Sequence, residues 1–150
     1  MALRSDRHEL DVDISFFMNE TASRGIVVSL STAGSGAAMD DSAALVTSKA
    51  NASGAAPLGV LLNDMVNLDQ TRQHINFHKD EVQKGGKVSV LRKGWVVTDQ
   101  ISGTPTVGQT AYLANSGQVS PTQAAGTVAV GRFTSVKDAD GFAKVDINLP

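Results

Sequence analysis

The chain has 150 residues, a length that suits one domain with a buried core. Its 13 Lys and Arg residues are scattered and are balanced by 15 Asp and Glu, a pattern that argues against nucleic-acid binding. The absence of cysteine excludes disulfides and thiolate metal sites. No apolar run reaches the about 20 residues of a membrane helix, and the first residues lack a signal-peptide core. We therefore expect a soluble protein made in the cytoplasm, with no membrane partner.

The first strand is predicted from Leu10 to Phe16. Leu10, Val12, Ile14 and Phe16 alternate with polar residues, which is the period of a half-buried strand. A second short strand is predicted from Ile26 to Leu30. Residues 1–30 therefore form one N-terminal unit of strands, interpreted either as an extended arm or as ordinary strands of the domain.

The next segment, residues 31–56, consists mostly of Ala, Gly, Ser and Thr. Such a composition is typical of a flexible linker or of a long surface loop around a short strand or helical turn, and we favour the loop. Short helices are the alternative at residues 40–48 and 64–70.

A denser pattern of strands fills residues 57–150. Lys87–Leu91 is expected to turn at Arg92-Lys93-Gly94 into a further strand at Trp95–Val97. The remaining predicted strands are Leu58–Leu62, Gln73–His78, Gln109–Ala114, Gln118–Ser120, Gly126–Phe133 and Phe142–Leu149.

The whole chain is therefore predicted to be all-β, a small β-barrel or sandwich of about eight to ten short strands with an extended N-terminal arm.

Two patterns of ligand-like residues are better explained by ordinary structure. His74 and His78 lie in a predicted strand, where four residues span about 13 Å, too far for one metal ion. Asp138-x-Asp140-Gly141 lacks the remaining ligands of a calcium loop and is expected to be a hairpin turn. No phosphate loop, nucleophile elbow or dinucleotide fingerprint is present. We expect no metal site, no cofactor and no enzymatic activity.

Trp95 is the only tryptophan of the chain. A tryptophan after a hairpin glycine can stack on a sugar, anchor an interface or cap a core. The core position is favoured.

Several segments between Pro57 and Pro150 resemble a known family in content and order. They are Pro57-Leu58-Gly59-Val60, the strand Gly86–Val90 followed by Gly94, Val107–Leu113, Asn115-Ser116-Gly117, Gly126–Phe133 and Asp140–Ile147. This part of the chain resembles the capsid decoration, or cement, proteins of tailed bacteriophages, especially those of cyanophage-like viruses. The resemblance implies a small β-barrel protein on the outer surface of a phage head that stabilises the shell of major capsid protein.

The resemblance also implies partners. They are the major capsid protein and further copies of the chain, with a trimer favoured and a dimer second. Residues 1–30 are expected to contact the capsid or a neighbouring copy, 31–56 to be a loop, and 57–150 to form the barrel. The residues expected at an interface are Arg4, Arg7, Leu10, Val12, Ile14, Phe16, Phe17, Arg24 and Trp95.

Two other functions remain open at this stage. A tail-tube or head-completion protein shares the β-rich, motif-poor character of this chain. A carbohydrate-binding β-module belongs to a different class and requires exposed aromatic platforms, for which Trp95 and Tyr112 are the candidates.

Overall fold

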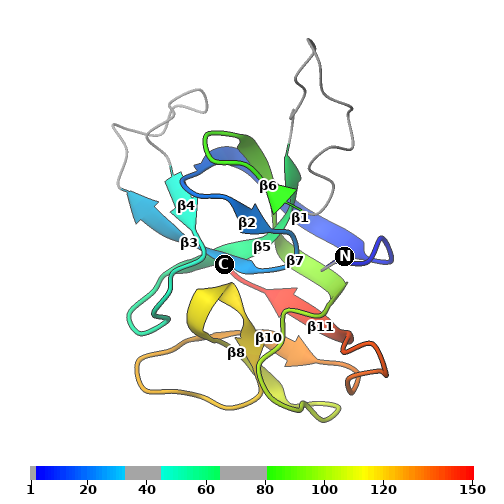
Figure 1. Ribbon diagram of the computed structural model, residues 1–150. Helices are drawn as coiled ribbons and strands as arrows, with labels where there is room; N and C mark the ends of the chain where they lie inside the picture. Colours follow the sequence, from blue (N-terminus) through cyan, green and yellow to red (C-terminus); the bar gives the residue numbers. More distant parts are fainter. Residues whose placement is uncertain (1–2, 33–44, 65–80) are drawn as a thin grey trace.

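The computed structural model describes residues 3–32, 45–64 and 81–150, and it is built almost entirely of strands (Figure 1). The elements are β1 His8–Met18, β2 Ala22–Ser23, β3 Val27–Thr32, β4 Leu45–Thr47, β5 Pro57–Asp64, β6 Glu81–Val82, β7 Lys87–Thr98, β8 Thr110–Leu113, the 3-10 turn η1 Asn115–Gly117, β9 Val119–Ser120, β10 Ala129–Phe133 and β11 Ala143–Asn148.

Nine of the strands form one sheet in the order β1-β4-β3-β5-β7-β11-β10-β8-β9, and β2 pairs with β6 in a small second sheet. The large sheet does not close into a barrel as a whole but folds over on itself like a sandwich. Figure 1 shows β8, β10 and β11 together on one side of β7, with β2 to β6 on the other. The all-β prediction is confirmed, in its sandwich form.

Strand β7 joins the two halves of the sheet. One of its edges pairs with β1 from His8 to Phe17. Its other edge pairs first with β5, through Val88 to Leu91, and then with β11, through Lys93 to Thr98. One continuous strand therefore belongs to both halves.

The predicted hairpin at Arg92-Lys93-Gly94 is wrong, because the chain runs straight through this point within β7. Gly94 serves a different purpose there. A Cβ atom on it would lie 2.0 Å from the carbonyl oxygen of His8, so the glycine allows the backbone of β1 to pass close to β7.

The strands β3 and β5 and the first part of β7, residues 88–91, are buried on both faces, between two apolar clusters. The large cluster comprises Leu3, Val27, Ala52, Val60, Leu62, Leu91, Val96, Ile101, Ala111, Leu113, Val119, Val130, Phe133, Ala143, Val145, Ile147 and Leu149. The small cluster comprises Met18, Ile26, Val28, Val46, Leu61, Val82, Val88 and Val90. Burial on both faces explains why these strands are continuous apolar runs instead of alternating patterns.

The predicted strands and turns can be compared with the described part of the chain. The strands begun at Leu10, Ile26, Leu58, Gln109, Gln118, Gly126 and Phe142 are confirmed as β1, β3, β5, β8, β9, β10 and β11. The helix proposed for residues 40–48 is wrong in its described portion, because Leu45–Thr47 is strand β4. The helix proposed for residues 64–70 and the strand at Gln73–His78 lie outside the described residues, except that Asp64 ends strand β5.

The close approach at Gly94 leads to a stability prediction. We expect Gly94→Ala to lower the free energy of unfolding by about 3 kcal/mol or more, because the new methyl group forces β1 away from β7. Gly85→Ala is a matched control, since Gly85 also has a positive φ but has nothing within 4 Å of the added atom. The control is expected to lose about 1 kcal/mol from backbone strain alone. Urea unfolding measures both, and equal losses would contradict the steric explanation.

Candidate interaction surfaces

The N-terminal segment lies within the sheet of its own chain. Besides the pairing of β1 with β7, Leu3 forms a bridge with Thr98, and the Arg4 N–H donates a 2.9 Å hydrogen bond to the carbonyl of Val97. Met18, at the end of β1, is fully buried. These contacts favour the interpretation of this segment as ordinary strand structure, and we expect deletion of residues 1–24 to unfold the chain.

The five apolar residues predicted as anchors have different surroundings. Val12 packs against the large cluster and Phe16 against the small one. Ile14 and Phe17 are half-buried, and the Lys87 Nζ lies 5.6 Å from the centre of the Phe17 ring. Leu10 alone is mostly exposed, at 72%.

The exposure of Leu10 results from an irregularity in β1. Glu9 pairs with Gly94 and Asp11 pairs with Lys93, so Leu10 is an extra residue without a partner on β7. Such a bulge turns a side chain out of the regular alternation of the strand. Leu10 is thereby presented to the solvent beside the sheet.

The two ends of the large sheet differ in how they are covered. At the β9 end, Ile101 bridges Val119 and the Ser102 N–H donates to the carbonyl of Val119. At the other end, β4 pairs with β1 only at Phe17 and Met18. Within the described parts of the chain, no strand pairs with the remaining outer edge of β1, which we call the β1 edge (residues 8–16). The β1 edge and Leu10 form the first candidate surface.

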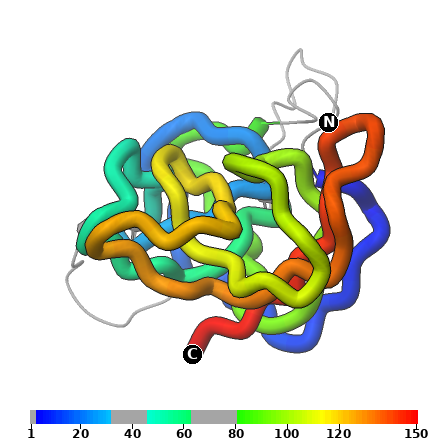
Figure 2. Tube along the Cα trace, turned by 90° about the horizontal axis from the view of Figure 1, so that it is seen from below, coloured from blue at the N-terminus to red at the C-terminus, as the bar shows by residue number. Residues whose placement is uncertain are grey.

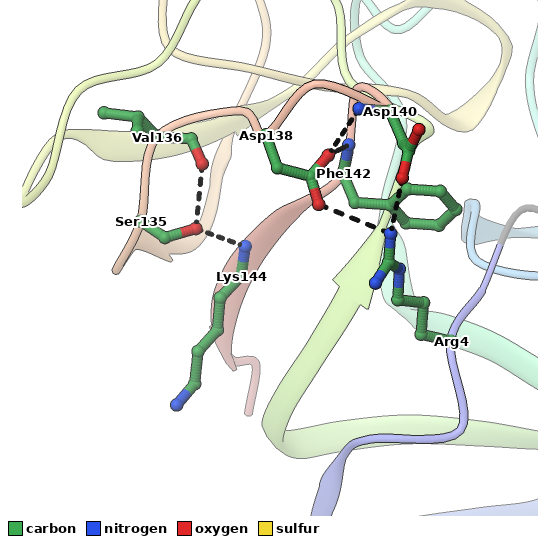
Figure 3. Close-up of polar contacts among 7 residues, drawn as sticks. All are labelled: Arg4, Ser135, Val136, Asp138, Asp140, Phe142 and Lys144. Carbon is green, nitrogen blue, oxygen red and sulfur yellow. Dashed lines mark hydrogen bonds and ion pairs between the residues drawn. The ribbon is translucent and has the colours of Figure 1, made fainter.

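Arg4 holds the N-terminal segment against the loop between β10 and β11 (Figure 3). Its Nη2 lies 3.3 Å from carboxylate oxygens of both Asp138 and Asp140, and its guanidinium carbon lies 4.3 Å from the centre of the Phe142 ring. Figure 2 likewise shows the blue start of the described chain beside this orange-red loop. The other oxygen of Asp138 accepts the N–H groups of Asp140 and Phe142, at 3.0 and 2.9 Å. The predicted hairpin turn is thus confirmed, and its carboxylates bind this arginine.

The other two predicted arginines also have close intramolecular surroundings. Arg7 pairs through its Nε with the carboxylate of Glu9. Arg24 is half-buried, and its Nε is buried without a hydrogen-bond partner. Arg4 and Arg7 are therefore already paired within the chain, a fact that the sequence pattern did not reveal.

Trp95 lies on the outside of the sheet and not in either apolar cluster. Its neighbours Gly94 and Val96 are buried, so the alternation of β7 places Trp95 on the opposite face, where it is half-buried. Lys144, from β11, places its Nζ 3.8 Å from the centre of the indole ring. The favoured core position is therefore not what the structure shows. The outer face of β7, β11, β10 and β8 is the second candidate surface.

The described residues also bear on two other kinds of site. In residues 3–32, 45–64 and 81–150, no group of three or more His, Asp or Glu residues is close enough to hold a metal ion. His74 and His78 lie outside these ranges. No helix within the same ranges is long and apolar enough to cross a membrane.

In the part of the chain that the structure describes, β1 therefore has an edge without a strand partner from residue 8 to 16, and such an edge can bind an extended segment of another protein. The chain matches the XM1 gp53 minor capsid protein family over residues 4–147, which is nearly its whole length, and it belongs to that family. It is a phage capsid-associated structural protein of the virion, in agreement with the predicted relation to phage capsid proteins. A search of curated protein sequences gave no match.

The contacts of Arg4 lead to a second prediction. Arg4→Ala removes two exposed ion pairs and a cation–π contact, and we expect it to lower the free energy of unfolding by about 1 kcal/mol. Arg7→Ala, the control, removes a pair between residues two apart in sequence and is expected to cost less than about 0.5 kcal/mol. Thermal unfolding combined with hydrogen exchange at the Arg4 amide measures both effects. An unchanged exchange rate in Arg4→Ala would show that Arg4 does not hold the segment.

Proposed function

We propose that the chain is a decoration protein that binds the outer surface of a phage head and stabilises the shell of major capsid protein. Its membership of a minor capsid protein family supports a place on the capsid. The observation that carries the proposal further is Leu10, an apolar side chain exposed on a bulge beside the unpaired β1 edge. An apolar anchor beside free backbone groups is what a partner strand can bind.

In this mechanism an extended segment of the major capsid protein lies along the β1 edge. Backbone hydrogen bonds supply affinity, and the side chain of Leu10 enters an apolar pocket of the partner. Val12 and Phe16 do not need to leave the core, because their packing fixes the position of β1. Ile14 and Phe17, both half-buried, lie along the same strand.

The irregular register of β1 serves the free protein as well. Shifts in the pairing with β7 occur between Glu9 and Asp11, between Asp11 and Val12, and between Asp13 and Phe16. Bulges of this kind twist an edge strand and hinder pairing between identical copies. They keep the edge from aggregating before the protein meets a head.

Arg4, Arg7 and Arg24 are proposed to lie at the rim of the capsid contact. For Arg4 and Arg7, pairing with acidic groups of the capsid means exchanging partners in their own chain. Such exchange is nearly neutral in energy for exposed pairs, so these residues contribute orientation more than affinity. The bound form is proposed to be a homo-oligomer, a trimer by the resemblance and a dimer as the second choice.

The direct test is to mix the purified protein with undecorated, expanded phage heads and to measure co-sedimentation. We expect saturable binding at a fixed ratio to the major capsid protein, and heads that open at a higher temperature. No binding to heads, combined with ring formation, would instead indicate a tail-tube or head-completion protein. Retention on an immobilised glycan would indicate a carbohydrate-binding module.

The position of the contact is tested by one substitution and its control. Leu10→Ser is expected to weaken head binding about tenfold, because it removes an apolar anchor worth about 1.4 kcal/mol or more. Val107→Ser is the matched control, since Val107 is 67% exposed in the turn that precedes β8. Its head binding is expected to stay within about twofold of the unmodified protein. If Leu10→Ser binds heads as well as the control does, the β1 edge is not the contact.

A further inference from the structure

Four residues form a straight row across the outer face of the sheet. Trp95 on β7 lies opposite Asp146 on β11, Asp146 lies opposite Arg132 on β10, and Arg132 lies opposite Thr110 on β8. Directly opposed residues of antiparallel strands point to the same face. We call these four residues the outer row; Trp95 is half-buried and the other three are exposed.

The two ends of the outer row differ in shape. At one end, the indole of Trp95 and the Lys144 side chain that lies over it form a bulky ridge. From the centre of the row to its other end the face is hollowed by about 500 Å³, lined by Thr110, Ala129, Gly131, Arg132, Asp146 and Asn148. Ala129 keeps the hollow open because its side chain is a single methyl group, and Gly131 contributes backbone to the lining.

The two residues at the centre of the outer row have opposite charges. Within the described chain, Arg132 and Asp146 form no ion pair with each other or with another residue. A partner surface with only acidic groups would be repelled by Asp146, and one with only basic groups would be repelled by Arg132. The face therefore fits a partner that carries both charges in the reverse order.

We propose that the outer row is the contact between two copies of this chain related by a two-fold axis, which makes the dimer and not the trimer that the resemblance favours. The axis runs parallel to the strands and between β10 and β11. Rotation about it places Arg132 of each copy against Asp146 of the other, and the ridge at Trp95 against the hollow at Thr110. Charge and shape are then both satisfied twice, as a two-fold contact requires.

The size of the face sets the expected strength of this pairing. Strands about 4.8 Å apart and about six residues long give a face of about 20 Å by 20 Å. This is smaller than the about 800 Å² that each partner buries in a standard interface. The pair is expected to be weak in solution and to be reinforced when both copies also bind one shell. The reinforcement on the shell rests on the proposed function. The self-association does not, because it is measured in the absence of phage heads.

Charge reversal provides a sharp experiment. Arg132→Asp alone places Asp against Asp in the pair, and Asp146→Arg alone places Arg against Arg. A mixture of the two variants restores two opposite-charge contacts, since one copy is then acidic and the other basic at both positions. Lys84→Asp and Asp6→Arg are the matched controls, because both residues are exposed and lie outside the outer row.

Sedimentation equilibrium up to about 1 mM protein measures the association. We expect the unmodified protein to form dimers, and we expect the same of a mixture of the control variants Lys84→Asp and Asp6→Arg. Each variant of the outer row alone is expected to associate at least about a hundredfold more weakly, and their mixture is expected to form a one-to-one pair. Thermal unfolding verifies that all variants are folded.

Three results would overturn the proposal. The first is an unmodified protein that stays monomeric at about 1 mM. The second is that Arg132→Asp alone and Asp146→Arg alone associate as strongly as the controls. A trimer of the unmodified protein that persists in both variants counts in the same way. The third is a mixture of Arg132→Asp and Asp146→Arg that stays monomeric although both variants are folded. If the protein dimerises in solution but does not bind phage heads, the proposed function is contradicted and the proposed contact between copies is not.

Discussion

The structure depends on the backbone of β7 being approached closely from both sides. Along one edge it meets β1, where Gly94 leaves room for the carbonyl of His8. Along the other it meets first β5, where a Cβ on Gly59 would lie 2.2 Å from the carbonyl oxygen of Leu91, and then β11. Two glycines with no freedom to become larger residues thus hold three strands at the spacing that the two apolar clusters require. Because one strand belongs to both halves, neither half is expected to unfold without the other.

The pairing of β1 with β7 explains how the N-terminal segment can be part of the fold and still offer a strand edge to a partner. One edge of β1 is bound to β7, and among residues 3–32, 45–64 and 81–150 only β4, at Phe17 and Met18, pairs with the opposite edge. A free arm would lose much conformational entropy when it binds, about 1 to 2 kcal/mol for each ordered residue. A strand that is already ordered does not incur that cost, so a small contact at Leu10 is sufficient to matter. The bulges limit what can pair with this edge and so add selectivity.

Local patterns predicted the local structure well. The alternation from Leu10 to Phe16 and that from Phe142 to Leu149 each need only the sequence of one strand, and both are strands. The turn at Asp138 was likewise predictable, because an aspartate that caps its own backbone acts within a few residues. Gly94 was misread because its neighbour in space, His8, is remote in sequence.

The candidate surfaces were harder to predict for the same reason. Of the outer row, only Trp95 drew attention, as the lone tryptophan of the chain. The outward direction of Asp146 was visible in the alternation of its strand. Its place between Trp95 and Arg132 needs the register of three strands, which is fixed by packing and not by local pattern. The internal pairing of Arg4 with Asp138 depends on contacts between opposite ends of the chain in the same way.

The two candidate surfaces meet at the pairing of β1 with β7. His8, at the start of β1, lies opposite Trp95, so the outer row continues directly into the strand that carries the β1 edge. A pair of copies joined through their outer rows therefore carries two β1 edges in a fixed relation to each other. On the proposed function, binding of one edge to a shell of repeating subunits would hold the second near the surface at a high effective concentration. On the proposed function, two weak contacts, one to the shell and one between copies, would together give lasting attachment.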